Sequence, residues 1–417
     1  MDVFSTPLKK QLLIIGAVWP EPNSTAAGTR MLQLIQLFLA AQYRITFASA
    51  SAESSHRFPL EDLGVTLQNI ELNHTSFDVF VEKLNPDTVL FDRFAMEEQF
   101  GWRVAKKCPA ALRILDTEDL HCLRSARQQA AKAQKTFELT DLHSDIAFRE
   151  IASIYRCDLS LMISSFEMEL LENHFKVPKA LLYYLPFLVD RLSEAEQDSL
   201  PSFSERQHFV TIGNFRHAPN WDSVLYLKQT IWPLLRKELP QAEMHVYGSY
   251  PPEKALQLQQ PKEGFYVKGW AKDAKQVLRN SKVCLAPLRF GAGLKGKFIE
   301  AMCCGTPSVT TAVGAEGMCG SNPWGGEIAD TPTALVSAAK ALYTDSNLWR
   351  KAQINGFEIL NKCFERNSFE SSFAERISAL EENLQSHRKQ NFYGALLQHH
   401  SMRSTEYLSR WIAEKNK

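Results

Sequence analysis

Residues 285–311 read LAPLRFGAGLKGKFIEAMCCGTPSVTT. The segment opens with a short apolar run typical of a buried strand, which we expect to end near Leu288. A loop then holds glycines and cations, and a helix begins near Lys297; these loop residues are Gly291, Gly293, Gly296, Arg289, Lys295 and Lys297. Glycines let backbone N–H groups approach an anion, and the cations and the helix N-terminus supply positive potential. The pattern predicts a phosphate-binding turn, and the alternative is a solvated glycine turn with its charges pointing outward.

Strand, loop and helix units also alternate before and after this segment. Apolar strand-like runs occupy residues 11–18, 43–50, 65–72, 87–92, 113–119 and 159–165 in the first half, and residues 208–215, 243–250, 263–270, 282–288 and 306–317 in the second. Such alternation is typical of parallel βαβ units, in which ligands bind at the carboxyl ends of the strands. The fold class is therefore α/β, with two Rossmann-like domains.

The domain boundaries follow from a polar segment in mid-chain. Residues 190–207 read DRLSEAEQDSLPSFSERQ and carry no sustained hydrophobic period. We expect an N-terminal domain at residues 1–187, a linker at 188–203, a second domain at 204–385 and a C-terminal helical extension at 386–417.

Composition narrows the class of protein. A chain of 417 residues exceeds one ordinary core, and 45% hydrophobic with 23% charged residues is typical of a globular protein. The formal net charge of zero argues against a nucleic-acid partner. No apolar run reaches the roughly 20 residues that cross a bilayer, and the N-terminus lacks a signal-peptide pattern. The 8 cysteines are dispersed, which predicts reduced cytosolic thiols, a cytoplasmic location and no metal site.

The segment at 285–311 resembles the donor-binding signature of the retaining glycosyltransferases of family 4 (group 1), which have the GT-B fold. The matching residues are Glu300, Ala301, Met302, Gly305, Pro307, Val309 and the GAEG run at 314–317. The family's first acidic position is Ala292 here. The resemblance implies two domains facing each other across a cleft, with C-terminal helices crossing back onto the first domain. It also implies a nucleotide-diphosphate sugar as co-substrate, retention of configuration, no cofactor and no obligatory metal.

The resemblance also implies site residues. Lys297 and Arg289 would stabilise charge on the leaving diphosphate, which is a catalytic role. The expected donor-binding residues are Gly28, Arg30, Gly213, Asn214, Arg216, Gly248, Lys268, Gly269, Gly291, Gly293, Leu294, Lys295 and Glu300.

On the acceptor side, residues 114–127 read ILDTEDLHCLRSAR and resemble the family's D-x-x-D-L-H-x-x-R element. We expect His121 to hydrogen-bond the donor sugar or the acceptor and Asp119 to orient it, so both are candidate catalytic residues. The alternative is structural, with an aspartate capping a helix and His121 as its partner.

The acceptor is left open as a glycan, a lipid-linked sugar or a small-molecule hydroxyl. Basic residues between Arg124 and Lys135 allow peripheral contact with the inner face of a membrane, although interspersed Gln and Ala also fit a solvated helix. The sequence gives no indication of an oligomeric state. Two further functions remain open: a sugar-nucleotide epimerase on the same fold, and an inactive nucleotide-sugar-binding scaffold, which Ala292 favours.

Overall fold

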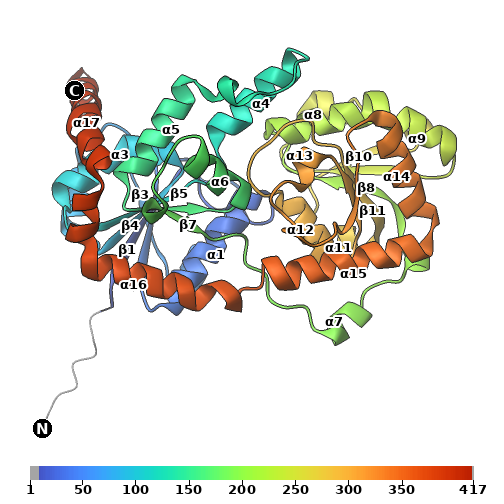
Figure 1. The fold of residues 1–417 in the computed structure, drawn as a ribbon, viewed down its shortest axis with the longest axis horizontal. Coiled ribbons are helices and arrows are strands. Elements are labelled where there is room, and N and C mark those ends of the chain that lie inside the picture. The colour runs from blue at the N-terminus through green and yellow to red at the C-terminus, as the bar shows by residue number, and fades with distance from the viewer. Residues whose placement is uncertain (1–8, 416–417) are drawn as a thin grey trace, which may run out of the picture.

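Two parallel β-sheets lie side by side in separate domains of the computed structural model, which describes residues 9–415 (Figure 1). Helices cover both sheets. The α/β class with two Rossmann-like domains is therefore confirmed. Residues 1–8 and 416–417 of the expected terminal segments lie outside the described residues.

The first sheet has 7 strands in the order β3-β2-β1-β4-β5-β6-β7. Its strands are β1 (Gln11–Gly16), β2 (Arg44–Ser49), β3 (Thr66–Asn69), β4 (Thr88–Asp92), β5 (Leu112–Asp116), β6 (Leu159–Met162) and β7 (Leu182–Tyr184). All neighbouring strands pair in parallel. Loops that follow the strands therefore emerge at one edge of the sheet, where sequence analysis placed the site.

The second sheet has 6 parallel strands in the order β10-β9-β8-β11-β12-β13. They are β8 (Gln207–Ile212), β9 (Met244–Tyr247), β10 (Phe265–Gly269), β11 (Ser281–Ala286), β12 (Ser308–Thr310) and β13 (Gly326–Ile328). Strand β13 was not expected, because three residues of mixed polarity carry no readable period.

The helices connect successive strands. In the first domain they are α1 (Ala26–Ala40), α2 (Ser76–Leu84), α3 (Phe94–Lys107), α4 (His121–Lys132), α5 (Asp145–Arg156) and α6 (Ser165–Asn173). After the short α7 (Glu194–Asp198), the second domain has α8 (Ala218–Tyr226), α9 (Trp232–Glu238), α10 (Glu253–Leu256), α11 (Ala274–Asn280), α12 (Gly296–Cys303), α13 (Ala312–Ala315), α14 (Pro332–Thr344) and α15 (Ser346–Cys363). The chain ends with α16 (Asn367–Gln390) and α17 (Phe392–Lys415).

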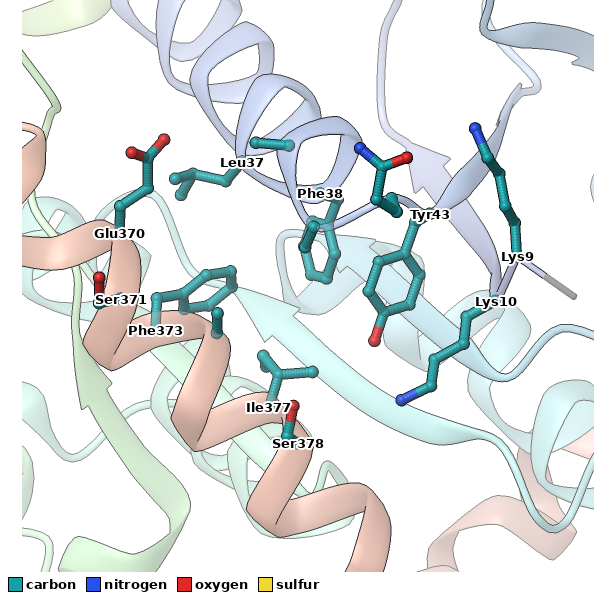
Figure 2. A pocket seen from close by; sticks show the side chains of 14 residues that line it. Lys9, Lys10, Leu37, Phe38, Tyr43, Glu370, Ser371, Phe373, Ile377 and Ser378 are labelled. Carbon is teal, nitrogen blue, oxygen red and sulfur yellow. The ribbon is translucent and has the colours of Figure 1, made fainter. Parts of the chain in front are cut away.

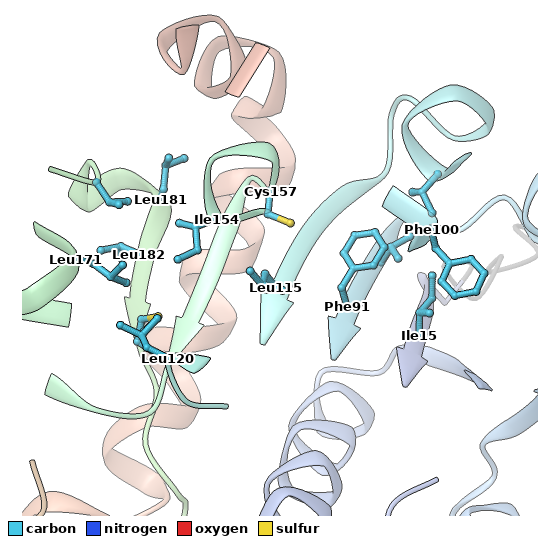
Figure 3. Close-up of a cluster of buried hydrophobic side chains, with 14 of the residues drawn as sticks. Ile15, Phe91, Phe100, Leu115, Leu120, Ile154, Cys157, Leu171, Leu181 and Leu182 are labelled. Atoms are coloured by element: carbon cyan, nitrogen blue, oxygen red, sulfur yellow. The ribbon is translucent and has the colours of Figure 1, made fainter. Parts of the chain in front are cut away.

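The core of the first domain explains why its strands read as apolar runs. Parallel strands are buried on both faces, so both sets of side chains must be apolar. On one face, Ile15, Phe91 and Leu115 pack against helix residues such as Phe100 and Ile154 (Figure 3).

The chain crosses between the domains twice. It leaves the first domain through a segment that contains α7, and it returns at Glu365, which forms a bridge with Val189. Helix α16 then runs along the first domain (Figure 1). The return therefore lies well before residue 386, where the sequence placed it. The reason is that Phe373, Ile377 and Leu380 on α16 complete the core of the first domain rather than that of the second.

Helix α16 meets the end of α1 at a hollow of about 600 Å³ (Figure 2). Phe38 of α1 and Phe373 of α16 make an edge-to-face contact there, with ring centroids 5.4 Å apart. The hollow belongs to the junction of α1 and α16 and contains none of the predicted site residues.

Within residues 9–415, no helix is long and apolar enough to cross a membrane.

Candidate active site

The loops that follow the strands of one sheet contact the loops that follow the strands of the other. Two sets of contacts join the domains. One set involves the glycine-rich segment at 291–297, and the other involves the loop after β1. Of the predicted catalytic residues, Asp119 lies against the first set of contacts, at Gly293.

Arg127 of α4 anchors the glycine-rich segment to the first domain. Its guanidinium makes two hydrogen bonds to the Glu316 carboxylate, at 2.7 and 2.8 Å, and a third to the Gly291 carbonyl at 3.0 Å. The Arg127 side chain is only 9% exposed. A bidentate, largely buried pair of this kind fixes the relative orientation of the two groups.

Gly293 brings the backbone of the second domain close to the first domain. Its φ of +63° lies in the left-handed region, and a Cβ at this position would stand 2.7 Å from the Cβ of Asp119. Its N–H donates to Glu167 Oε1 at 2.7 Å, and the same oxygen accepts from Leu120 N at 3.2 Å. Glu167 thus holds the glycine-rich segment against the residues that precede α4.

The second set of contacts joins the loop after β1 to the ends of β9 and β10. Tyr250 donates to the Glu21 carboxylate at 2.9 Å, and Trp270 Nε1 donates to the Asn23 carbonyl at 3.2 Å. Ser249 donates to the Ser24 carbonyl at 3.2 Å. The His56 ring lies 4.7 Å from that of Trp270.

Asp119, His121 and Arg124 come together on the first domain. Asp119 accepts a hydrogen bond from Arg124 at 2.5 Å, and His121 Nε2 lies 3.4 Å from its other oxygen. Burial opposes ionisation of Asp119, but the charge of Arg124 lowers its pKa overall. Burial lowers the pKa of His121 to about 4, against the opposing effect of Asp119. At neutral pH the site therefore presents a carboxylate, a guanidinium and a neutral imidazole.

Glu150 caps helix α4, which carries His121 and Arg124. Its carboxylate accepts the backbone N–H groups of His121 and Cys122, both at 2.9 Å, and so caps the start of α4. A carboxylate at a helix N-terminus is favourable, because it satisfies amides that have no partner within the helix. Glu150, and not Asp119, therefore caps α4. Asp119 contacts His121 and Arg124 instead.

Lys297 and the start of α12 form the facing surface on the second domain. Lys297 Nζ donates to Asn220 Oδ1 at 2.7 Å, and Asn220 Nδ2 donates to the Asn214 carbonyl at 3.0 Å. Burial lowers the pKa of Lys297 to about 8. The first turn of α12 has no side-chain cap. The Phe298 amide donates to the Lys295 carbonyl at 2.9 Å, which leaves the amides of Gly296 and Lys297 for an anion.

Lys295 occupies a buried position beside Lys297. Its Nζ donates to the Gly293 carbonyl at 2.7 Å. Burial lowers its pKa, while the nearby carboxylates of Glu316 and Glu167 oppose that shift. Lys295 therefore adds positive charge next to the interdomain contacts.

Two predicted residues are engaged elsewhere: Arg30, expected to bind the donor, and Arg289, expected to be catalytic. Arg30 is 1% exposed, and its guanidinium bonds to Asp116 and to the carbonyls of Leu185 and Pro186. Arg289 is exposed and pairs with Asp222 of α8 at 2.5 Å. Both have structural partners, so neither enters the proposal below.

Lys268 and Arg216 are also engaged away from Lys297. Lys268 is exposed, with its amine 4.6 Å from the Tyr266 ring centroid. Arg216 is exposed and stacks over Tyr250 at 3.7 Å. Arg216 therefore belongs to the second set of interdomain contacts.

The remaining predicted residues shape the backbone. A Cβ at Gly248 would stand 2.1 Å from the Gly213 carbonyl, so β8 and β9 depend on glycine at their ends. A Cβ at Gly28 would stand 2.4 Å from the Glu21 carbonyl carbon, and the Gly28 amide donates to the Thr25 hydroxyl. The loop after β1 therefore requires glycine at this position. Three further predicted donor-binding residues are Gly269, Leu294 and Glu300. Gly269 ends β10, and Leu294 is buried in the core of the second domain. Glu300 is partly buried on α12, and burial raises its pKa to about 7.

Sequence reasoning missed two residues near Asp119. Arg93 directly follows β4 and donates to Glu118 at 2.8 Å. His217 precedes α8 on the second domain and interacts electrostatically with Arg124, Asp119 and Lys297. Both follow the carboxyl ends of strands, and that position is the signal that would have found them.

Comparison with known proteins agrees with this architecture. Residues 206–345 match the family model described as glycosyl transferases group 1. No match was found among curated protein sequences.

Solved structures with similar folds span nearly the whole chain. Sucrose-phosphate synthase from Thermosynechococcus elongatus is 16% identical, with a TM-score of 0.65 over 89% of this chain and 99% of that chain. The Anabaena protein HepE in complex with UDP is 12% identical, with a TM-score of 0.63 over 89% and 100%. WaaG, described as a glycosyltransferase involved in lipopolysaccharide biosynthesis, is 12% identical, with a TM-score of 0.57 over 87% and 98%. The chain thus has the GT-B fold of these structures, and its residues 206–345 are similar to the glycosyl transferases group 1 family model.

Proposed function

We propose that the protein transfers a sugar from a nucleotide-diphosphate sugar to an acceptor hydroxyl, with retention of configuration and without a metal. The observation that carries the proposal is that Lys297 and the uncapped start of α12 lie on one domain while Asp119 and His121 lie on the other. Cations with helix amides suit a diphosphate, and hydrogen-bonding groups opposite suit a sugar. The acceptor is a glycan, a lipid-linked sugar or a small-molecule hydroxyl.

The diphosphate would bind at Lys297, Lys295 and the first-turn amides of α12. Both lysines have pKa values lowered by burial. A bound diphosphate restores the protonated state, because an opposite charge favours the charged form. The lysines would then stabilise the negative charge that develops on the leaving diphosphate in the transition state.

The sugar would lie beside Asp119 and His121. A neutral imidazole donates and accepts hydrogen bonds without adding charge. Asp119, held by Arg124, would orient the His121 imidazole. The carboxylate would also stabilise positive charge that develops at the anomeric carbon.

The nature of the nucleotide is a narrower proposal. HepE has been solved with UDP and with UDP-glucose. A uridine nucleotide is therefore the first donor to test, with guanosine and adenosine nucleotides beside it.

Nucleotide binding is the direct test. Isothermal titration calorimetry with UDP, GDP, ADP, CMP and their sugar conjugates should find one nucleotide that binds at micromolar strength. Lys297→Ala should weaken that binding at least tenfold, since it removes a charge-assisted contact worth about 1.5–3 kcal/mol. Lys340→Ala is the matched control, because Lys340 is an exposed lysine of the same domain that pairs with Glu238 at 2.7 Å. Equal effects of the two substitutions, or no binding at all, would exclude the proposed donor site.

A turnover assay distinguishes sugar transfer from epimerisation and from nucleotide-sugar binding without catalysis. With EDTA present and an acceptor panel supplied, nucleotide release that requires an acceptor indicates transfer. Release of an epimerised free sugar without acceptor indicates an epimerase, and binding without release indicates a scaffold. The anomeric configuration of the product, read by NMR, tests retention.

A further inference from the structure

Two histidines and a glutamate meet on the second domain, away from the interdomain contacts. His208 is the second residue of β8, Glu243 directly precedes β9, and His245 is the second residue of β9. His208 Nδ1 lies 3.5 Å from Glu243 Oε2, and His245 Nε2 lies 2.8 Å from the same oxygen. The three potential ligand atoms all lie within 4.8 Å of one another.

The sheet brings these residues together. Strands β8 and β9 are parallel neighbours, with Phe209 paired to Met244. Both histidines stand at the amino ends of their strands, so they lie at the sheet edge opposite Gly213 and Gly248. His208 has a φ of +61°, an unusual conformation for a residue other than glycine. In that conformation its ring stacks on that of His245, with centroids 4.4 Å apart.

The charge states of these groups match those of metal ligands. Burial lowers the pKa of both imidazoles, so each is neutral near pH 7 and retains a lone pair. Burial opposes ionisation of Glu243, but the hydrogen bond with His245 and the nearby histidines lower its pKa overall.

We propose that His208, Glu243 and His245 bind a late first-row divalent cation such as Zn²⁺. Two imidazole nitrogens and one carboxylate oxygen form a common Zn²⁺ ligand set, with bonds of about 2.0–2.2 Å and a fourth position open to water. Imidazole suits Zn²⁺, Ni²⁺ and Cu²⁺, whereas Mg²⁺ and Ca²⁺ require oxygen ligands. A tetrahedral ion with these bond lengths needs its ligand atoms about 3.3–3.5 Å apart. The observed separations are 2.8 Å, 3.5 Å and at most 4.8 Å, so binding requires the side chains to rotate.

The ion would join β8 to β9 at the amino edge of the sheet. It lies apart from Lys297 and Asp119, so its role is to stabilise the domain rather than to take part in sugar transfer. The proposal is therefore independent of the proposed function.

One neighbouring group opposes the cation. Lys268 of β10 interacts electrostatically with His208, Glu243 and His245. Its positive charge lowers the affinity of a cation at this position. Removal of Lys268 should therefore strengthen binding, an effect that loss of folding cannot imitate.

Calorimetric titration of Zn²⁺ into the full chain without a polyhistidine tag tests the proposal. We expect one site with micromolar or tighter affinity, and Zn²⁺ should raise the melting temperature while Mg²⁺ does not. His245→Ala and Glu243→Gln should each weaken the affinity at least tenfold, and Lys268→Ala should strengthen it about threefold. His74→Ala is the matched control, since His74 is an exposed histidine with one carboxylate, Glu71, 3.8 Å away. It should leave the titration unchanged.

Cobalt provides a second readout. Co²⁺ in a four-coordinate site should give visible d–d absorption that His245→Ala removes. The proposal is overturned if Zn²⁺ does not bind, or if its affinity is the same in wild type and in a folded His245→Ala variant. Equal affinity of wild type and Lys268→Ala would also contradict it.

Discussion

The α-carbon of Gly293 faces the side chain of Asp119 across the two domains: a Cβ at residue 293 would stand 2.7 Å from the Asp119 Cβ. Real Cβ atoms essentially never approach this closely. The glycine-rich segment of one domain is thus in direct contact with a candidate catalytic carboxylate of the other. Any side chain at residue 293 must separate them.

Gly293→Ala should therefore open the interface. The new methyl group overlaps Asp119, and the φ of +63° is unfavourable for alanine, with a strain of about 1–3 kcal/mol. We expect a lower melting temperature and a larger radius of gyration in small-angle X-ray scattering. Gly291→Ala is the steric control, because its Cβ would meet only Lys295 Cε at an ordinary 3.6 Å. Identical scattering for both variants would contradict the contact.

Arg127 and Glu316 should be energetically coupled. Arg127→Met leaves the Glu316 carboxylate partly buried without its partner, and breaking a buried pair costs up to about 3–5 kcal/mol. Glu316→Gln in the same background should cost less than it does alone. Urea unfolding of the two single variants and the double variant measures this coupling, which should be at least about 0.5 kcal/mol. Strict additivity would mean that the pair contributes nothing in solution.

Nucleotide binding should weaken above about pH 8. Lys297 has a pKa lowered by burial to about 8, so it is charged below that pH and neutral above it. The other charged groups near it are Glu300 and Lys295. Calorimetry from pH 6.5 to 9.5 should show affinity falling above pH 8 by up to about tenfold per pH unit for each lysine that must be protonated, and Lys295 contributes to this slope together with Lys297. Lys297→Met should bind weakly with a shallower pH dependence, and an unchanged profile would exclude Lys297 as the titrating group.

Phe373→Ala should destabilise the first domain although the residue follows the second domain in sequence. Phe373 is 3% exposed and packs between Phe38 and Tyr183. Removing a buried phenylalanine ring costs about 3–5 kcal/mol. Phe392→Ala is the control, because Phe392 is 71% exposed and its loss should change stability by less than about 0.5 kcal/mol. Similar unfolding curves for the two variants would show that α16 does not complete this core.

The sequence determined the fold class, and it marked the glycine-rich segment that forms part of the candidate site on the second domain. The alternating apolar runs predict parallel strands because such strands are buried on both faces. Glycines and lysines at 291–297 mark the end of β11 because backbone access and charge are local properties of the chain. For the same reason the D-x-x-D-L-H-x-x-R pattern placed Asp119, His121 and Arg124 together.

The tertiary structure decided which charged residues are free for a ligand and where the domains exchange helices. Arg30 and Arg289 carry the expected charge, but Asp116 and Asp222, both distant in sequence, engage them. Phe373 joins the first domain because an apolar helix face specifies burial, not which core will bury it. His208 and His245 are likewise far apart in sequence and meet only because β8 pairs with β9. The local sequence determines the backbone conformation near a residue and the charge of its side chain. The partners of that side chain depend on how the whole chain packs.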